Sequence, residues 1–352
     1  MTSYERILTT IDHKKPDRSP CDIKAVQKVV EDLVAYLAMG GTEQLYQHLG
    51  VDFRHFSSAI NKAQLVPNRL RRQYENAGSL IASPYGVVSL KHANFPQAHR
   101  ISGPFYQNRD LDSFDWPKPD DVVLSEETIR AIELCNQAGL CSSVSYDNPF
   151  KIGYFMRRYD DFMADCLLDP DYIIELLTRI SAVEIKRAEL AVQAGARSAL
   201  ISGDFADQRS LMVSPDVFRR VLKPILADAV ARIKAINPDV LPILHSDGNL
   251  FDVLPDLIEC GFVAVHPIQL ECMDMLEVKQ KYGDKLTLFG GISVQSELPF
   301  LKPPEIRRLV RQRIEQLGGD GGFMLAPTNT ILPDVPQENT VALFREVTSL
   351  QP

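Results

Sequence analysis

The sequence predicts an α/β protein built as a single TIM-type (β/α)8 barrel over residues 1–352. About eight short apolar runs alternate with amphipathic segments of helical length, which is the pattern of βα units around a parallel sheet. The chain has 352 residues and 45% hydrophobic content, enough to fill a barrel core. No internal repeat, low-complexity tract or linker divides the chain. We therefore expect one domain.

The predicted strands are the apolar runs, several of which end in polar residues. In chain order they are 20–23 (PCDI), 52–57 (DFRHFS), 141–146 (CSSVSY), 198–202 (SALIS), 241–245 (LPILH), 262–267 (FVAVHP), 285–290 (KLTLFG) and 322–326 (GFMLA). Between the second and third runs, SLIASPYGVVSLKH (79–92) has two alternating stretches about a Pro-Tyr-Gly turn. This pattern predicts a β-hairpin inserted into the N-terminal half of the barrel.

Two of the predicted helices have clear start signals. Asp169 can cap the helix that Pro170 begins and Gly195 ends. Ser214 and Pro215 form the same signal before DVFRRVLKPIL.

Composition excludes several classes of function. The chain has 46 acidic and 38 basic side chains, a net charge of −8, and no basic stripe, so we do not expect it to bind nucleic acid. No segment is apolar enough for a signal peptide or a membrane span. The six cysteines contain no CxxC pair, which favours reduced thiols. We expect a cytoplasmic protein that does not associate with membranes.

Polar residues gather where the predicted strands end. In a β/α barrel these ends form the active-site face, so residues from different strands can share one pocket. The later strands contribute His245, Ser246, Asp247, His266, Gln269, Glu271, Gly290, Gly291, Thr328 and Asn329, and the earlier strands contribute Tyr146, Asp204 and Gln208.

Several of these residues also have an interpretation without function. Asp247 and Gly248 are a common turn pair, and a histidine such as His245 is often a hydrogen-bonded core residue. Glu271 could cap the following helix. Gly290 and Gly291 could simply allow close packing, although paired glycines also let a ligand approach the backbone. Tyr146 could pack in the core, and Asp204 could cap a helix.

Several motifs together resemble the uroporphyrinogen decarboxylase superfamily. They are HSDGNL, LFGGISVQ and GGFMLAPTNTILPDVPQEN, with LLDPDYIIELL and LMVSPDVFRRVLKP upstream. The resemblance covers nearly the whole chain and implies a β/α barrel. The superfamily contains cofactor-free tetrapyrrole decarboxylases and methyltransferases that move methyl groups to or from corrinoid proteins.

The sequence departs from the decarboxylase pattern at the residues that bind a porphyrinogen. The paired arginines are replaced by PCDIKAVQKVV, which leaves Lys24, and the aspartate of an FSD-like segment corresponds to Ser58. The family's tyrosine corresponds to Phe155, beside Tyr154, and its C-terminal histidine corresponds to Asn329. A single lysine cannot reproduce a pair of guanidinium clamps on carboxylates, which argues against uroporphyrinogen as the substrate.

The layout is closer to the methyltransferases, which in this resemblance hold zinc on a His-x-Cys, a second cysteine and an exchangeable glutamate. The corresponding residues here are His245, Asp247, Asn329 and Glu271. Oxygen donors thus replace two thiolates, so the resemblance implies a divalent metal whose identity, zinc or a harder ion, stays open. An oxygen-rich site would favour binding a hydroxyl or methoxy oxygen.

The leading hypothesis is a methyltransferase that moves a methyl group between a small substrate and a corrinoid protein, with an O-methylated compound as one option for the substrate. His245, Asp247 and Glu271 would hold the metal, and His245, Asp247 and Asn329 would take part in catalysis. The substrate-binding candidates are Tyr146, Asp204, Gln208, Gln269, Gly290 and Gly291. A cofactor-free decarboxylase and a non-catalytic binding barrel stay open as alternative functions. The oligomeric state also stays open, with a homodimer as one option.

Overall fold

The centre of the protein is a curled sheet of seven parallel strands. The computed structural model describes residues 1–92 and 98–349. The strand order is β1-β7-β8-β9-β10-β11-β12, with β1 (Phe53–Phe56), β7 (Cys141–Asp147), β8 (Ser198–Ser202), β9 (Leu241–His245), β10 (Ala264–Ile268), β11 (Thr287–Ile292) and β12 (Phe323–Pro327). The α/β class is confirmed, and the strands correspond to seven of the eight predicted apolar runs.

The eighth run, 20–23, lies between β12 and β1 without forming a strand. The carbonyl of Pro20 accepts from the Leu325 N–H (2.8 Å), and the carbonyl of Cys21 accepts from the Asp52 N–H (2.9 Å). Cys21 makes an isolated parallel bridge with Leu325. A regular ladder cannot form, because Pro20 has no N–H and the Cys21 N–H donates to the Asp52 carboxylate (2.8 Å).

A buried charge cluster holds this segment in position. Asp52 is fully buried and accepts from Arg6 Nη1 (2.7 Å) and from Arg18 Nη1 (2.8 Å). Two guanidinium groups and the Cys21 N–H therefore surround one carboxylate, which satisfies a charge that would otherwise be very costly to bury.

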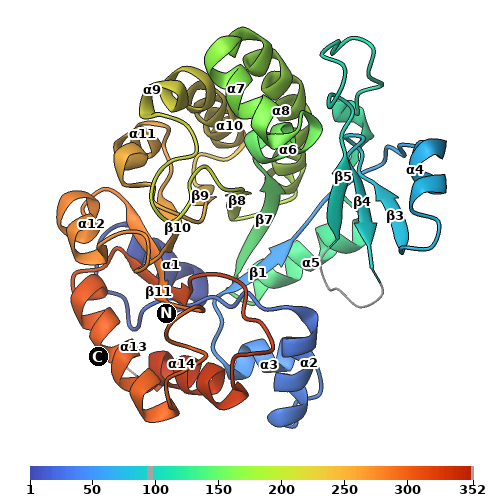
Figure 1. Cartoon of the computed structure of the whole chain (residues 1–352). Helices are drawn as coiled ribbons and strands as arrows, with labels where there is room; N and C mark the ends of the chain where they lie inside the picture. The colour runs from blue at the N-terminus through green and yellow to red at the C-terminus, as the bar shows by residue number, and fades with distance from the viewer. Residues whose placement is uncertain (93–97, 350–352) are drawn as a thin grey trace.

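The helices surround the sheet, and one of them closes its amino end (Figure 1). Ile7 packs among the inward-facing side chains of the strands, including Phe53, Ile243 and Phe289. The helices are α1 (Ser3–Ile11), α2 (Gln27–Tyr36), α3 (Thr42–His48), α4 (Asn68–Gln73), α5 (Glu126–Gln137), α6 (Pro149–Met156), α7 (Tyr159–Leu168), α8 (Pro170–Gln193), α9 (Pro215–Val217), α10 (Lys223–Ile236), α11 (Leu254–Glu259), α12 (Met275–Tyr282), α13 (Pro303–Gly318) and α14 (Gln337–Ser349).

Both predicted helix starts are confirmed. Asp169 accepts from the Tyr172 N–H at the start of α8, and Ser214 accepts from the Val217 N–H at the start of α9. A π-helical turn, Phe218–Leu222, then joins α9 to α10. Pro224 follows at once and cannot donate to a carbonyl in the preceding turn, which gives the irregular turn a local cause.

A small antiparallel sheet stands beside the barrel (Figure 1). It contains β3 (Ser79–Ala82), β4 (Val88–Lys91) and β5 (His99–Ser102) in that order. Strands β3 and β4 pair from Ser79 opposite Lys91 to Ala82 opposite Val88. The segment after β5 returns to the barrel, where the Phe105 N–H donates to the carbonyl of Met156 at the end of α6 (3.0 Å). A short pair, β2 (Ala59–Ile60) and β6 (Val122–Val123), flanks this insertion.

Within the described ranges, the helices include none that combines the length and apolar character needed to span a membrane.

We predict that Asp52→Ala lowers the free energy of unfolding by about 3 to 5 kcal/mol, because it removes the buried carboxylate that pairs with both Arg6 and Arg18. Arg6 keeps its ion pair with Asp17, whereas Arg18 loses its carboxylate partner. Denaturant titration followed by circular dichroism measures this change. The control is Asp32→Ala, which removes the mainly exposed ion pair with Lys28 and should cost less than about 1 kcal/mol. A similar loss in both variants would contradict a special role for the Asp52 cluster.

Candidate active site

Three side chains that could hold a metal ion meet at the carboxyl end of the sheet. Asp204 follows β8, while His245 ends β9 and Asp247 lies two residues beyond it. One ligand atom from each residue lies within 4.8 Å of the others. Carboxylate oxygen and imidazole nitrogen are donors that suit zinc and harder divalent ions.

The backbone after β9 is shaped to present Asp247. Gly248 has φ +97°, and a Cβ there would lie 2.5 Å from the carbonyl oxygen of Asp207, so only glycine fits this turn. The Gly248 N–H donates to Gln269 Oε1 (2.8 Å), and the Asp247 N–H donates to Asp204 Oδ1 (3.0 Å). Asn329, after β12, donates from Nδ2 to Asp247 Oδ2.

Hydrogen bonding fixes the tautomer of His245. Burial lowers the pKa of His266 to about 4 and the pKa of His245 well below its ordinary value, so both rings are neutral near pH 7. His266 Nε2 lies 3.2 Å from the Pro327 carbonyl, which can only accept. His266 Nδ1 must therefore accept from His245 Nδ1, 2.7 Å away. The lone pair of His245 is left on Nε2.

Lys24 lies against this lone pair. Its ammonium is 3.4 Å from His245 Nε2. Burial lowers the pKa of Lys24, while the nearby carboxylates of Asp247 and Asp204 oppose that change. The segment that completes the barrel wall thus contributes a cation to the same site.

Asp247 occupies an unfavourable position for a negative charge. Burial raises its pKa to about 6, and the charge of Asp204 adds to the effect, whereas Lys24 and Asn329 partly offset it. Its Oδ1 atom is buried and has no hydrogen-bond partner within the described structure. A proton or a cation at this position would remove the penalty.

Below the cluster, a cavity of about 310 Å³ extends into the barrel. Its wall carries the hydroxyls of Ser143, Ser145 and Ser202, and its deeper part is apolar, with Leu200 and Phe289 among the residues that line it. At the opposite wall, His55 Nε2 lies 2.7 Å from Asp22 Oδ2. Such a cavity suits a small molecule that is largely apolar.

Glu271 does not join Asp204, His245 and Asp247 in the three-residue group. Its Oε1 atom accepts hydrogen bonds from the hydroxyls of Ser293 and Ser296, both in the loop after β11. The short loop after β10 directs Glu271 toward that neighbouring loop. Asp204, which the sequence suggested only as a substrate contact, takes the place expected for Glu271.

Two glutamines from the predicted set support the loops around the site. Gln269 is buried and accepts from the Gly248 N–H. Gln208 is exposed and donates to Gln295 Oε1 (3.1 Å), which links the loops after β8 and β11. Gln269 therefore positions the Asp247 turn, and Gln208 lies at the rim.

Tyr146 faces away from the barrel interior. It packs in the core between sheet and helices, while its neighbours Ser145 and Ser143 line the interior cavity. Alternate residues of a strand point to opposite faces, so the parity of β7 separates Tyr146 from the cavity.

Gly290 and Gly291 are packed against neighbouring strands. Their φ values are +127° and +87°, and an added Cβ would lie 3.1 Å from the Ile268 nitrogen and 3.1 Å from the Phe323 ring, respectively. Backbone conformation and close packing account for both glycines.

Sequence reasoning did not assign a role to His266 or to the Asp22–His55 pair. The signal for His266 was present, since it ends an apolar run beside the one that ends at His245. Nothing in the local sequence indicated that Asp22 and His55 would pair.

The comparisons with known proteins agree with this architecture. The family model described as uroporphyrinogen decarboxylase (URO-D) matches residues 101–350. None of the curated proteins matches the chain. Among solved structures, a methyltransferase from Methanosarcina mazei has a TM-score of 0.70 at 19% identity, with 99% of each chain covered. An alpha-amylase from Geobacillus thermoleovorans has a TM-score of 0.45 at 9% identity, covering 94% of this chain and 78% of the other. The chain belongs to the uroporphyrinogen decarboxylase family.

Proposed function

We propose that the protein is a methyltransferase that moves a methyl group between a small substrate and a corrinoid protein, with a divalent metal ion held by Asp204, His245 and Asp247. The observation that carries the proposal is this donor cluster at the carboxyl end of the sheet. The similarity in fold to a methyltransferase over 99% of both chains supports it. A solvated surface acid cluster would not need the buried histidine pair behind it.

The residues fit a divalent ion for three reasons. The tautomer of His245 leaves Nε2 available as a ligand, and the bond from Nδ1 to His266 orients the ring. Asp247 Oδ1 is buried without a partner. The two carboxylates provide negative charge for such an ion, and the neutral imidazole adds a nitrogen donor. Lys24 opposes binding, because its ammonium faces the same nitrogen.

A bound ion would supply Lewis acidity toward an oxygen atom of the substrate. The residues of the chain would bind and orient the substrate. Asn329 holds Asp247 in position through its amide, Ser145 and Ser202 offer hydrogen bonds inside the cavity, and Lys24 presents an ammonium to an electron-rich substrate atom. The apolar part of the cavity excludes water from the methyl group.

The direction that best suits oxygen ligands is demethylation. A Co(I) corrinoid would supply the acceptor for the methyl group, and the substrate oxygen released from that methyl group would need a proton. Lys24 is placed to deliver that proton, because its ammonium faces the same site and burial lowers its pKa, whereas Asp247 is engaged with the ion in this proposal. The corrinoid protein would bind at the open face of the barrel.

A metal-free decarboxylase is the second candidate, and the raised pKa of Asp247 favours it. A carboxyl group with a pKa of about 6 could protonate the carbanion left by the loss of carbon dioxide. Lys24 would then pair with the substrate carboxylate.

Metal binding separates these two candidates. We expect the protein, loaded with zinc and dialysed, to retain about one ion per chain by elemental analysis. His245→Ala, Asp204→Asn and Asp247→Asn should each weaken zinc binding by at least about tenfold in competition titrations. Lys24→Met should instead strengthen zinc binding, because it removes the positive charge that lies beside His245 Nε2 and repels the ion.

Glu271→Gln is the matched control, since its carboxylate is engaged by two serines and should leave zinc affinity unchanged. Weaker zinc binding in this variant would indicate that Glu271 is a metal ligand. Failure of the wild type to bind zinc, manganese or cobalt would leave the decarboxylase as the better candidate.

Methyl transfer can be tested with free cob(I)alamin as the acceptor. We expect at least one member of a panel of small methoxylated compounds to convert it to methylcobalamin, followed by absorbance, with a rate that His245→Ala lowers by at least about a hundredfold. Carbon dioxide release from acids without methyl transfer would support the decarboxylase. Binding of a panel compound without turnover, even beside a corrinoid protein, would instead indicate a binding barrel.

The charge of Asp247 should also appear in the pH dependence of stability. Its folded-state pKa of about 6 lies above its ordinary value of 3.8, so its contribution to the free energy of unfolding falls as pH rises from about 4 to about 6. In metal-free protein, Asp247→Asn should therefore match the wild type below pH 4 and be more stable by about 1 to 2 kcal/mol above pH 6. Exposed Asp252→Asn should show no such pH-dependent gain, and equal curves for wild type and Asp247→Asn would refute the raised pKa.

A further inference from the structure

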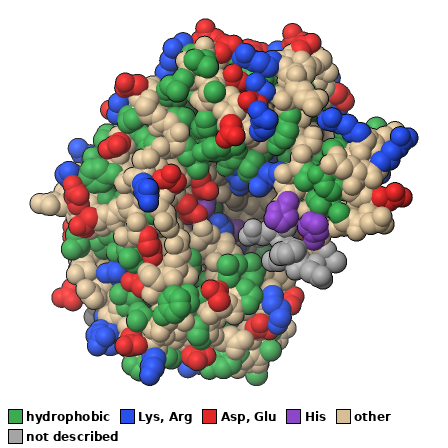
Figure 2. Space-filling model, viewed as in Figure 1, with side chains coloured by type: hydrophobic (Ala, Val, Ile, Leu, Met, Phe, Trp, Pro, Cys, Tyr) green, Lys and Arg blue, Asp and Glu red, His purple; other side chains and the backbone are tan. Residues whose placement is uncertain are grey.

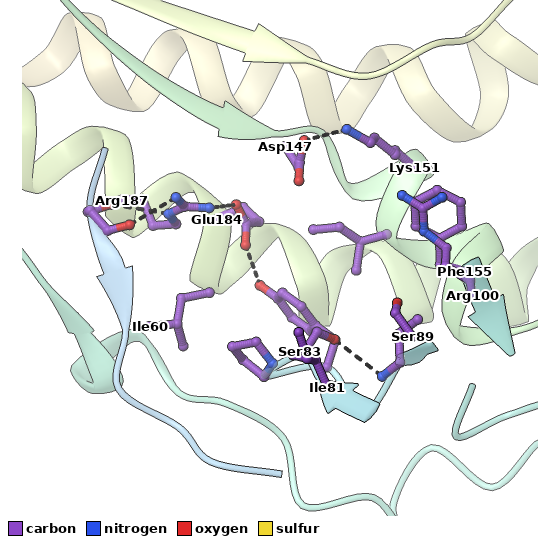
Figure 3. Close-up of a pocket in the computed structure, with 15 residues that line it drawn as sticks. Ile60, Ile81, Ser83, Ser89, Arg100, Asp147, Lys151, Phe155, Glu184 and Arg187 are labelled. Atoms are coloured by element: carbon purple, nitrogen blue, oxygen red, sulfur yellow. Dashed lines mark hydrogen bonds and ion pairs between the residues drawn. The ribbon is translucent and has the colours of Figure 1, made fainter. Parts of the chain in front are cut away.

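A second pocket lies between the inserted sheet and the barrel (Figure 3). It has a volume of about 420 Å³. Strands β3 to β5 form one side of it, and the end of β7 together with α6 and α8 forms the other. Ile60, Ile81 and Val87 give it an apolar surface. The view in Figure 2 shows a hollow between the two parts of the molecule, with basic side chains on its wall.

Most of the charges that line this pocket are paired. Lys151 Nζ bonds Asp147 Oδ1 (2.8 Å). Glu184 accepts from the Tyr85 hydroxyl (2.7 Å) and pairs with Arg187 (2.9 Å). Arg187 also donates to the Ser58 carbonyl (2.9 Å). These groups satisfy one another and need no ligand.

Arg100 is the exception. Its guanidinium lies 3.4 Å from the centre of the Phe155 ring, and within the described residues it has neither an acidic partner nor a hydrogen bond. The residue is exposed overall, and partial desolvation against the pocket wall lowers its pKa, an effect that Tyr154 and Asp147 partly offset. An arginine that stacks on a ring keeps the N–H groups at its edge free to donate in the plane of the guanidinium.

This pocket adjoins the candidate active site. Lys151 lines the pocket, and its charge helps to lower the pKa of both His245 and Lys24. Gly203, directly before Asp204, is so close to Lys151 that an added Cβ would lie 3.0 Å from the Lys151 Cβ. Tyr154 lies near enough to Asp204 and Arg100 for both charges to act on its pKa.

We propose that this pocket binds a carboxylate group through Arg100, and that it holds the acidic end of a substrate whose other end reaches Asp204, His245 and Asp247. The second half of this statement rests on the proposed function. A planar carboxylate can accept two parallel hydrogen bonds from one guanidinium edge. The apolar side chains would contact the body of the molecule. The substrate class is therefore an acid with a single carboxylate and an apolar, methoxylated body.

Benzoate is a suitable probe because it needs neither metal nor turnover. We expect it to bind the wild-type chain with millimolar affinity in isothermal titration, and the neutral isostere benzamide to bind at least about tenfold more weakly. Arg100→Gln should weaken benzoate binding by about tenfold or more and bring it to the level of benzamide. Ser89→Phe, which fills the pocket and leaves Arg100 in place, should also abolish binding.

Arg72→Gln is the matched control, because Arg72 is an exposed arginine on α4 of the same insertion and does not line the pocket. It should bind benzoate as the wild type does. If Arg100 only fastens the insertion to Phe155, Arg100→Gln will lower the unfolding midpoint and leave benzoate affinity intact. That outcome, or equal binding of benzoate and benzamide, would overturn the proposal.

The two proposals can fail separately. If the wild-type protein does not bind zinc, the metal-site proposal fails, but benzoate binding can still depend on Arg100. Conversely, the chain can bind zinc and transfer methyl groups without discriminating benzoate from benzamide. As the direct link between the sites, Arg100→Gln should raise KM for a methoxybenzoate at least about tenfold with little change in kcat. Equal KM values would exclude Arg100 from substrate binding.

Discussion

The buried carboxylate of Asp52 determines how the barrel wall is completed, and the candidate site depends on that closure. Segment 20–23 bridges β12 and β1 with few backbone hydrogen bonds, and the charges of Arg6 and Arg18 hold it through Asp52. The residue that follows, Lys24, is thereby carried to within 3.4 Å of a histidine 221 positions later in the chain. A structural ion cluster on one side of this segment thus fixes the Lys24 ammonium beside the candidate site on the other side.

Around the Lys24 ammonium, the candidate site contains ionisable groups that influence one another's charge. Burial keeps His245 and His266 neutral, whereas burial and the nearby charge of Asp204 raise the pKa of Asp247. Such a site has two ways to lower its free energy: it can protonate Asp247 or take up a cation. The methyltransferase and decarboxylase proposals correspond to these two solutions, which is why the same residues serve both.

The sequence predicts most of the sheet because its strands are apolar, short and well punctuated, and these signals are local. Pro20 marks where the prediction of a regular eighth strand was wrong, since a proline beside a carboxylate-bound N–H cannot continue a ladder. The orientation of Tyr146 follows from the register of β7, which fixes Ser145 inside. The partners of Glu271 could not be predicted, because Ser293 and Ser296 reach it only through the packing of two loops. The membership of Asp204 in the donor cluster could not be predicted either, because it also depends on how loops pack in the folded chain.

The barrel and the insertion differ in how firmly they hold the residues of the two proposed sites. Asp204, His245 and Asp247 are attached to adjacent parallel strands, so their spacing is set by the sheet and tolerates little change. Arg100 belongs to β5 of a small sheet that packs on a small hydrophobic cluster, which includes Val66, Leu70 and Val88. Changes in that sheet can alter the second pocket without moving the donor cluster. We infer that the barrel ends define the chemistry available to this chain, and that the proposed Arg100 pocket of the insertion selects the substrate on which it acts.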